Sequence, residues 1–570
     1  MYNQARSRLH LNIAGPALLA CLAFFLPFEA KQPLLHLAFM QITSVELLLY
    51  LVLIAWGVGW VGGEWRSWSI CHTGVAIWAL VIFLSASLAP FERVAAFKFA
   101  LRSLGGCALF FAAADLSTTY RRVRQVVIAL AAGACISAAA GWAEVVWTPA
   151  ARLLSAFKTQ PSLVGGFLRA SGTFQYANIA AMYWEAVAPL CLALALVHGI
   201  RDKCPRLMWL FLAVLLVVVE AIMLSMSRAA IVLVTGVLIL CLALARSVIP
   251  MRRTLLLACL LAAVSPLVVH LLLADSFRLR LRAPEESSWY RAEYTGVFNT
   301  LQLRPGQILL LPVRIHNLGA MTWKSEGAHP IAISYHWEDP GHGGFTDWDG
   351  MRTWLPREVP PGTDVDMSVR IRVPALIGHY VLHLDMVHEG ATWFSLQGSP
   401  ALRIPAEVWT ALAEASTEER TRQLFRPVFS RIIARGELWR AALKMWKDHP
   451  ILGVGPDNFR LSYGPYLGLK EFDNRIHSNS LYLETLANMG TLGMLALAAV
   501  CLPLAATLWR FWHQAACPEV KLVALGLGAS IASFYLHGFV DYFLEFTPTY
   551  ALFWLVLGMA AGLARSKAIS

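Results

Sequence analysis

Residues 207–245 read LMWLFLAVLLVVVEAIMLSMSRAAIVLVTGVLILCLALA, and this stretch decides the fold class. Two apolar windows, 207–225 and 229–245, flank the short turn Ser225-Met226-Ser227-Arg228. A helix needs about 20 apolar residues to cross a hydrocarbon core about 30 Å thick. We therefore interpret the two windows as membrane-spanning helices that are joined by a tight turn on the outer side.

Ten further windows of this kind occur in the 570-residue chain. They lie at 11–29, 43–61, 70–89, 94–114, 125–146, 176–199, 254–274, 491–509, 519–540 and 546–564. The pattern predicts a polytopic α-helical membrane protein of about 12 transmembrane helices, with about nine in a membrane part at 1–275 and about three at 479–570. Hydrophobic residues make up 57% of the chain and charged residues 15%, whereas a soluble domain carries roughly a quarter charged residues. The composition excludes soluble, disordered and collagen-like proteins.

The distribution of basic residues predicts the orientation. If the N-terminus is cytoplasmic, the predicted inner loops hold sixteen Lys and Arg residues and the short outer loops hold six. This bias places both termini in the cytoplasm and the polar segment 276–478 on the outer side. The net charge of +11 therefore reflects topology, and we expect no nucleic-acid partner. All ten cysteines fall in spans or inner loops, so no disulfide framework is predicted outside.

The first half of the outer segment predicts a β-sandwich (immunoglobulin-like) insertion at 287–403. Short alternating runs are separated by turn-rich pieces such as Asp339-Pro340-Gly341, at the spacing of a sandwich of about 100 residues. The runs are Gln307–Ile315, Pro330–Trp337, Thr363–Val373, His379–Val387 and Thr392–Leu396. Six tryptophans gather here, at 289, 323, 337, 348, 354 and 393. We favour core tryptophans over a glycan-binding surface, because sandwich cores bury tryptophan routinely.

The second half of the outer segment, 406–478, predicts a helical loop. The periodicity becomes helical at 406–427 and again at Phe429–Lys447. Gly453-Val454-Gly455-Pro456 follows the second helix, and its prolines favour a helix stop with a tight turn over a phosphate-binding loop.

Several cations lie where a positive-inside protein has few. Arg169 precedes the sixth span, and Arg228 lies in the turn between the seventh and eighth. Converging arginines offer planar forks that suit a diphosphate, although single arginines also snorkel to lipid headgroups. Lys98 and Arg102 share one face of the fourth span, where an intramembrane cation is a candidate functional residue. Arg431, Arg435 and Arg440 punctuate the outer helix.

Two histidines lie beside the C-terminal spans. His477 stands in the polar stretch Arg475-Ile476-His477-Ser478-Asn479-Ser480, where a neutral imidazole can act as a general base. His537, Asp541 and Glu545 are spaced to share one face if the eleventh span continues. A second ligand cluster is missing from this pattern, so we predict no metal and no other cofactor.

The motifs, in this order, resemble the O-antigen ligase and O-antigen polymerase superfamily of multi-span bacterial glycosyltransferases. The matching pieces are Arg169-x-Ser-Gly-Thr-Phe with Asn178 and Pro189, Ser225-x-Ser-Arg228, Arg435-Gly-Glu-Leu-Trp439 running to Gly453-Val-Gly455 and Phe459, and His477-Ser-Asn479-Ser-Leu481-Tyr-Leu483-Glu484 ending in Gly490-Thr-Leu-Gly493.

The resemblance implies metal-independent, inverting transfer of a glycan from undecaprenyl diphosphate to an acceptor hydroxyl, at the periplasmic face of the bacterial inner membrane. It implies that Arg169, Arg228 and Arg435 hold the diphosphate and that His477 is the essential histidine. In the family's ligases an Asn directly follows the His and a glycine stands ten residues after that Asn, whereas here the spacing from His477 to Gly490 is two residues longer and Asn479 stands two residues after His477. Either His477 or Asn479 therefore fills the family's histidine position. The sandwich is a further departure, since a minimal member of the family lacks it.

Four functions stay open. A ligase would use lipid A-core or another glycan as acceptor, a polymerase would extend the lipid-linked O-antigen or exopolysaccharide, and a third class of transferase glycosylates protein hydroxyls. Twelve spans with both ends inside also fit a transporter, which predicts broken helices and ionisable groups at the midplane of both halves. The cations of this chain instead concentrate at the outer interface, which favours a transferase, most of all a ligase.

Overall fold

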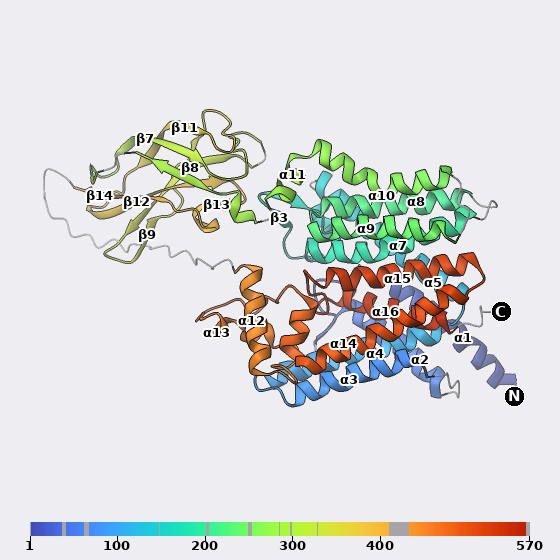
Figure 1. The fold of residues 1–570 in the computed structure, drawn as a ribbon. Helices are drawn as coiled ribbons and strands as arrows, with labels where there is room; N and C mark the ends of the chain where they lie inside the picture. The colour runs from blue at the N-terminus through green and yellow to red at the C-terminus, as the bar shows by residue number, and fades with distance from the viewer. Residues whose placement is uncertain are drawn as a thin grey trace. The chain divides into compact units, whose positions relative to one another are not determined.

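In the computed structural model, the chain forms two compact units. The structure describes residues 2–36, 41–61, 68–147, 149–200, 205–248, 253–283, 285–296, 299–327, 329–409 and 433–565. The helical unit contains Met1–Ser162, Arg169–Leu273 and Ile433–Ser570, and the sandwich unit contains Leu163–Leu168 and Ala274–Ile432. Figure 1 labels the elements of both units.

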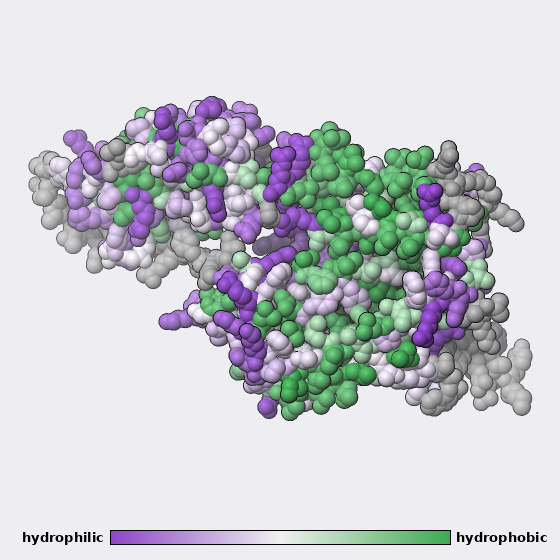
Figure 2. Space-filling view, viewed as in Figure 1, coloured by the Kyte–Doolittle hydropathy of each residue, from purple (hydrophilic) through white to green (hydrophobic). Residues whose placement is uncertain are grey.

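The helical unit confirms a polytopic membrane protein. Its long helices are α1 (Tyr2–Phe25), α2 (Ser44–Val61), α3 (Ile70–Ser87), α4 (Arg93–Leu116), α5 (Tyr120–Val146), α7 (Ala177–Ile200), α8 (Pro205–Leu224), α9 (Arg228–Arg246), α10 (Arg253–Leu273), α14 (Leu481–Gln514), α15 (Pro518–His537) and α16 (Thr547–Ala564). Among the described residues, eleven helices are long and apolar enough to cross a membrane, and a shorter apolar stretch of α1, Ala14–Phe25, accounts for the first predicted window. Hydrophobic residues cover the visible sides of these helices, and hydrophilic residues gather at the two ends (Figure 2).

Two helices form the centre of this unit. The apolar window of α7 is fully buried and that of α16 almost fully, whereas the other spans keep an exposed side. Small residues let α16 approach α4 closely, since a Cβ on Gly558 would lie 2.6 Å from the carbonyl oxygen of Phe110. Buried helices at the centre provide a rigid base for the loops at their ends.

The outer helical segment packs on the start of α14. Helix α12 (Arg435–Asp448) and the short α13 (Phe459–Tyr466) share a buried cluster with α14. Its members are Leu438, Ala441, Ala442, Met445, Val454, Phe459, Tyr463 and Ala487. The helix predicted at Phe429–Lys447 is therefore present from Arg435 onward, and residues 429–432 lie outside the described part of the chain.

Helix α14 is broken at Gly490, whose φ of 63° is left-handed. The break frees the carbonyls of Ala487 and Asn488, which accept hydrogen bonds from Val454 N–H (2.9 Å) and Gly455 N–H (2.9 Å). The Gly453-Val454-Gly455 turn thus donates these two amide hydrogens to α14, which confirms the tight turn favoured from the sequence. A phosphate-binding loop would need such amides to point at a ligand.

The sandwich unit has two sheets. Their strands are β5 (Ala292–Thr295), β6 (Leu301–Leu303), β7 (Ile308–Asn317), β8 (Ile331–Asp339), β9 (Gly344–Asp347), β10 (Thr353–Trp354), β11 (Asp364–Arg372), β12 (Gly378–His388), β13 (Thr392–Trp393) and β14 (Leu402–Val408). The larger sheet has the order β10-β8-β12-β14-β6, with β9 on β8 and β13 on β12, and the smaller has the order β11-β7-β5. Four of the predicted strand runs coincide with strands; of the fifth, Thr392–Leu396, only Thr392–Trp393 is a strand, and Ser395–Gln397 forms a 3-10 helix.

Side chains from the larger sheet reach the smaller one. Trp337 Nε1 donates to the carbonyl of Arg372 (2.9 Å), and the amide of Arg372 donates to the hydroxyl of Tyr335 (3.0 Å). Trp289, Trp323 and Trp337 are fully buried, which confirms the core interpretation for three of the six tryptophans. Trp354 is half exposed, and Trp348 and Trp393 lie around the ring of His336.

The helix predicted at 406–427 is wrong at its start. Residues 406–408 complete strand β14, which pairs antiparallel with β12 and parallel with β6. The alternation of buried Ile404, Ala406 and Val408 with more exposed neighbours has the period of a strand. Residues 410–427 lie outside the described part of the chain.

Candidate functional site

His477 lies in the loop that leads into α14. Ser480 caps this helix, since its hydroxyl accepts from the amide of Leu483 (3.4 Å). The backbone around His477 is fixed from two sides: Trp439 Nε1 of α12 donates to the carbonyl of Ser478 (3.0 Å), and the amide of Leu481 donates to the carbonyl of Gly538 (2.7 Å). The outer helix, the start of α14 and the end of α15 therefore meet at this histidine.

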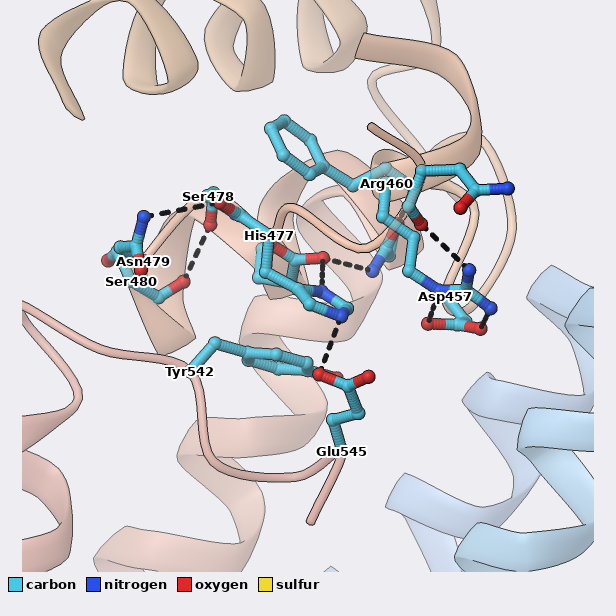
Figure 3. Close-up of polar contacts among 12 residues, drawn as sticks. Asp457, Arg460, His477, Ser478, Asn479, Ser480, Tyr542 and Glu545 are labelled. Carbon is cyan, nitrogen blue, oxygen red and sulfur yellow. Dashed lines mark hydrogen bonds and ion pairs between the residues drawn. The ribbon is translucent and has the colours of Figure 1, made fainter. Parts of the chain in front are cut away.

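The imidazole of His477 lies between two carboxylates (Figure 3). Nδ1 lies 2.9 Å from Oε1 of Glu484, and Nε2 lies 2.9 Å from Oε2 of Glu545. The side chain of Glu484 is fully buried, whereas that of Glu545 is 34% exposed. Tyr542 covers the ring, with centroids 5.0 Å apart. Both ring nitrogens are thus covered, Nδ1 by a fully buried carboxylate and Nε2 by Glu545, which is itself partly exposed.

The carboxylates make His477 a cation in this arrangement. Burial alone would lower its pKa, but Glu484 and Glu545 outweigh burial and raise the pKa from 6.5 to about 10. Burial likewise opposes the charge of Glu545, yet the contact with His477 holds the pKa of that carboxyl below its usual value. His477 and Glu545 titrate as a coupled pair, so the proton is shared between the two groups.

Glu484 also holds the backbone that presents His477. Its Oε2 accepts from the amide of Ser478 (2.7 Å), and its Oε1 accepts from Nδ2 of Asn488 (3.4 Å). Asn488 in turn accepts from the amide of Phe459 through Oδ1 (2.7 Å). One buried carboxylate thus fixes both the ring and the main chain of the His477 loop.

Asp457 and Arg460 extend the polar cluster. Arg460 donates to Asp457 through Nε (2.9 Å) and Nη2 (2.7 Å), and through Nη1 to the carbonyl of Asn474 (2.9 Å). Burial raises the pKa of Asp457 despite this partner. Both residues are close enough to Glu545 to influence its charge. The sequence reasoning did not single out either residue.

Asn479 has a left-handed backbone, with a φ of 53°. Its Nδ2 donates to the carbonyl of His477 (3.4 Å), and in Figure 3 its side chain lies away from Glu545. Of the two residues that compete for the family's histidine position, it is therefore His477 that the carboxylates hold.

The two arginine motifs meet where α7 begins and α8 ends. Arg169 donates through Nε to the carbonyl of Ser225 (2.6 Å) and through Nη2 to Oδ1 of Asn178 (2.6 Å). The amide of Ala170 donates to the carbonyl of Leu224 (3.0 Å). Arg228 is the first residue of α9 and is half-buried. The structure thus joins the Arg169 motif to the Ser225–Arg228 turn.

A buried ion pair, missed in the sequence reasoning, locks the loop after Arg169. Glu144 of α5 contacts Lys158, and its Oε2 accepts from the amides of Ser171 (3.1 Å) and Gly172 (3.0 Å). Lys158 also donates to the hydroxyl of Ser171 (2.8 Å). The sequence did contain a sign of this ion pair, because a carboxylate near the end of an apolar span is usually paired with another charged or polar group.

An aromatic contact connects this loop to the His477 cluster. The rings of Tyr176 and Phe546 lie with centroids 5.7 Å apart. Tyr176 is seven residues after Arg169, and Phe546 directly follows Glu545. Both motifs therefore lie at the same end of the helical unit.

The other predicted cations have different surroundings. Arg102 lies 3.5 Å from Glu46, donates to the hydroxyl of Thr547 (2.9 Å) and stacks over Tyr550, so it braces α2, α4 and α16. Lys98 is exposed. Arg435 is exposed at the start of α12, and Arg431 lies outside the described residues.

The expected common face of His537, Asp541 and Glu545 is wrong. Helix α15 ends at His537, and residues 538–546 form a loop that turns Glu545 toward His477. His537 Nδ1 instead lies 2.6 Å from Oε2 of Glu185 in α7, and both side chains are buried.

Within the described ranges, no group of three or more His, Cys, Asp or Glu side chains could hold a metal ion. A family model described as O-antigen ligase matches residues 407–498, which include α12, α13, His477 and the Gly490 break. None of the curated proteins compared with the chain matches it.

Proposed function

We propose that this chain, whose residues 407–498 match a family model described as O-antigen ligase, transfers a glycan from undecaprenyl diphosphate to an acceptor hydroxyl at the outer face of a bacterial inner membrane. The observation that carries the proposal is the His477 imidazole, which is fixed by Glu484 on one side and contacts the partly exposed Glu545 on the other. This geometry supports removal of a proton from a hydroxyl that approaches Nε2.

In the reaction, the acceptor oxygen forms a bond to the anomeric carbon of the glycan, and the bond from that carbon to the diphosphate breaks. The diphosphate leaves with the bonding electrons, and the hydroxyl proton passes to Nε2 of His477. In the resting arrangement Nε2 already carries a proton, so this proton must first pass to Glu545 or to solvent. Glu484 keeps Nδ1–H in place during the exchange, as the orienting carboxylate of a catalytic triad does.

The arginines are proposed to bind the leaving diphosphate. Ser225 and Asn178 hold the Arg169 fork at a defined angle, and Arg228 lies at the adjoining helix start. Such preorganised cations stabilise charge that develops in the transition state. We assign Arg435 to the same anion from the side of the outer helix. The contacts of Arg102 favour a bracing role, and the exposure of Lys98 favours an interface anchor.

The raised pKa of His477 favours a second interpretation of its role. An imidazolium can stabilise the diphosphate directly and leave the hydroxyl proton to Glu545. The acceptor also has alternatives: lipid A-core or another glycan in a ligase, the lipid-linked glycan itself in a polymerase, or a protein hydroxyl. A ligase is our first choice because the matching family model is described as O-antigen ligase.

A purified-component assay tests the proposal. Detergent-solubilised protein is mixed with a labelled undecaprenyl diphosphate-linked oligosaccharide and lipid A-core without added metal, and the label is followed on a gel. Label on lipid A-core supports a ligase, and lengthened lipid-linked product supports a polymerase.

His477→Ala is the test variant in this assay, and His379→Ala, at a largely exposed position of the sandwich, is the matched control. Equal turnover in the two variants would overturn the site. Absence of transfer to any glycan, lipid or protein acceptor would overturn the function.

A further inference from the structure

A short hairpin precedes Arg169. Strand β3 (Ser162–Val164) pairs with β4 (Phe167–Arg169), so the second strand ends on the arginine assigned to the diphosphate. Gly165 and Gly166 form the turn, and both have left-handed φ values, 55° and 76°. The hairpin turn belongs to the sandwich unit, since residues Leu163–Leu168 cluster with Ala274–Ile432.

Side chains of the sandwich unit hold this turn. The amide of Gly165 donates to Oε1 of Glu286 (2.7 Å). A Cβ on Gly165 would overlap the indole ring of Trp289, and one on Gly166 would lie 3.0 Å from Cε1 of His388. Because Gly165 has no side chain, the backbone of the turn can approach the ring of Trp289 closely.

The residues that hold the turn are themselves firmly fixed. Trp289 is fully buried, and its Nε1 donates to the carbonyl of Ala283 (2.9 Å). His388 contacts the hydroxyl of the buried Tyr290 (3.1 Å) and ends strand β12. The carbonyl of Ser288 accepts from the amide of Ala320 (3.0 Å). A displacement of the hairpin turn would therefore disturb the sandwich core.

We propose that the sandwich insertion positions Arg169, with Glu286 and Trp289 as the positioning residues that act through the hairpin turn. The inference rests on the proposed function, in which Arg169 binds the diphosphate. Only Phe167 and Leu168 separate the turn from Arg169, and β4, which contains all three residues, pairs with β3. Within the helical unit, Arg169 donates to Ser225 and Asn178.

The first test compares two glycine substitutions. Gly165→Ala places a methyl group against Trp289, whereas Gly362→Ala places one at an equally left-handed position of the sandwich, with a φ of 75° and open space around it. We expect Gly165→Ala to lower kcat/KM for the lipid-linked donor about tenfold, and Gly362→Ala to change it less than about twofold. Equal effects of the two substitutions would overturn the inference.

The second test uses Glu286 and a double-mutant cycle. Glu286→Ala removes the acceptor of the Gly165 amide, and Glu286→Gln keeps an oxygen there, so the Gln variant should restore most of the lost kcat/KM. In an Arg169→Ala background, Gly165→Ala should cause no further loss, because its effect passes through Arg169. A full additional loss in that background, or no recovery with Gln, would overturn the inference.

Hydrogen exchange separates this inference from the proposed function. Glu286→Ala should raise amide exchange in residues 163–173 while thermal unfolding of the helical unit is unchanged. Unchanged exchange in this segment would overturn the positioning role. If the wild-type protein transfers no glycan but exchange rises, positioning of Arg169 stands and the proposed function fails.

Discussion

Two histidines beside the C-terminal spans each face a buried glutamate, but only one of them also contacts a partly exposed carboxylate. His537 contacts Glu185 between α15 and α7, and side-chain exposure is 1% and 0%. His477 contacts the equally buried Glu484, but its second nitrogen faces Glu545, which is 34% exposed. A contact between histidine and glutamate thus occurs once as a sealed contact between two helices and once beside a partly exposed carboxylate.

The difference shows what separates a structural histidine from a candidate base. A nitrogen that exchanges protons with substrate needs a path to solvent, whereas a sealed pair can only hold its helices together. Sequence spacing did not show which histidine is structural, because each of them has a carboxylate at a helical interval along the chain. What distinguishes them is Glu545, the partly exposed second carboxylate that contacts His477.

The largest expected effect is that of removing each imidazole. His477→Ala should lower kcat of the folded protein about a thousandfold, within the range that general acid–base catalysis supplies, and it should also lower stability, because the buried Glu484 loses its partner. His537→Ala should lower stability by about 3–5 kcal/mol for the same reason, since Glu185 is left buried, but the folded protein should keep its turnover. Turnover assays and thermal unfolding in detergent check both. Normal turnover of His477→Ala would contradict the comparison.

A double replacement provides the control for that experiment. Glu185→Leu with His537→Phe removes the sealed pair and leaves no buried charge, so stability should recover and turnover should stay normal. The corresponding replacement at Glu484 and His477 should recover stability alone.

A smaller effect is expected from the carboxylate that orients the ring. Glu484→Gln keeps the shape of the side chain but weakens its hold on Nδ1 and on the amide of Ser478. We expect kcat to fall about a hundredfold while KM for the acceptor stays within about twofold, because ring orientation matters most in the transition state. A rise in KM at constant kcat would mean that Glu484 serves binding instead.

Arg169→Lys should come next. Lysine keeps the charge but cannot reach Ser225 and Asn178 in two directions, so kcat/KM for the donor should fall about tenfold. Steady-state kinetics with varied donor concentration measure the change. Lys98→Ala, at an exposed position of α4, is the matched loss of a cation and should have almost no effect.

The smallest effect is a shift of the pH profile. The pKa of His477 is raised from 6.5 to about 10, so the ion pairs stabilise the fold fully below pH 6.5 and lose this contribution as the pH rises toward 10. If Nε2 is the base, turnover should rise over the same range, and Glu545→Gln should move the rise to lower pH. A fall in turnover as the pH approaches 10 would instead support the cationic role of His477.

The sequence predicted the membrane architecture well because apolar windows of span length have few alternative explanations. Four strand runs were also found over nearly their whole length, and the fifth only at Thr392–Trp393, since alternation is a local signal. The strands β5, β6, β9 and β10 were missed because they are two to four residues long, too short to show an alternation. The last residues of β14, 406–408, were read as the start of a helix.

The site was predicted only in part. His477, Arg169 and Arg228 stood out from their position in the chain, but Glu484 and Glu545 became partners of His477 only through folding. Glu545 reaches the ring because α15 stops at His537 and the following loop bends back, which helical spacing could not reveal. Glu144 and Lys158 are likewise distant along the chain and adjacent in the fold.

The 450–455 turn holds both sides of the break at Gly490. Before the break, the carbonyls of Ala487 and Asn488 accept from Val454 and Gly455, and after it the amides of Thr491 and Leu492 donate to the carbonyls of Pro450 (2.8 Å) and Ile451 (3.1 Å). A Cβ on Gly490 would lie 2.4 Å from the carbonyl oxygen of Ile451. We therefore expect a Gly490 substitution to displace the turn and the His477 loop together, and so to lower activity although Gly490 touches no substrate.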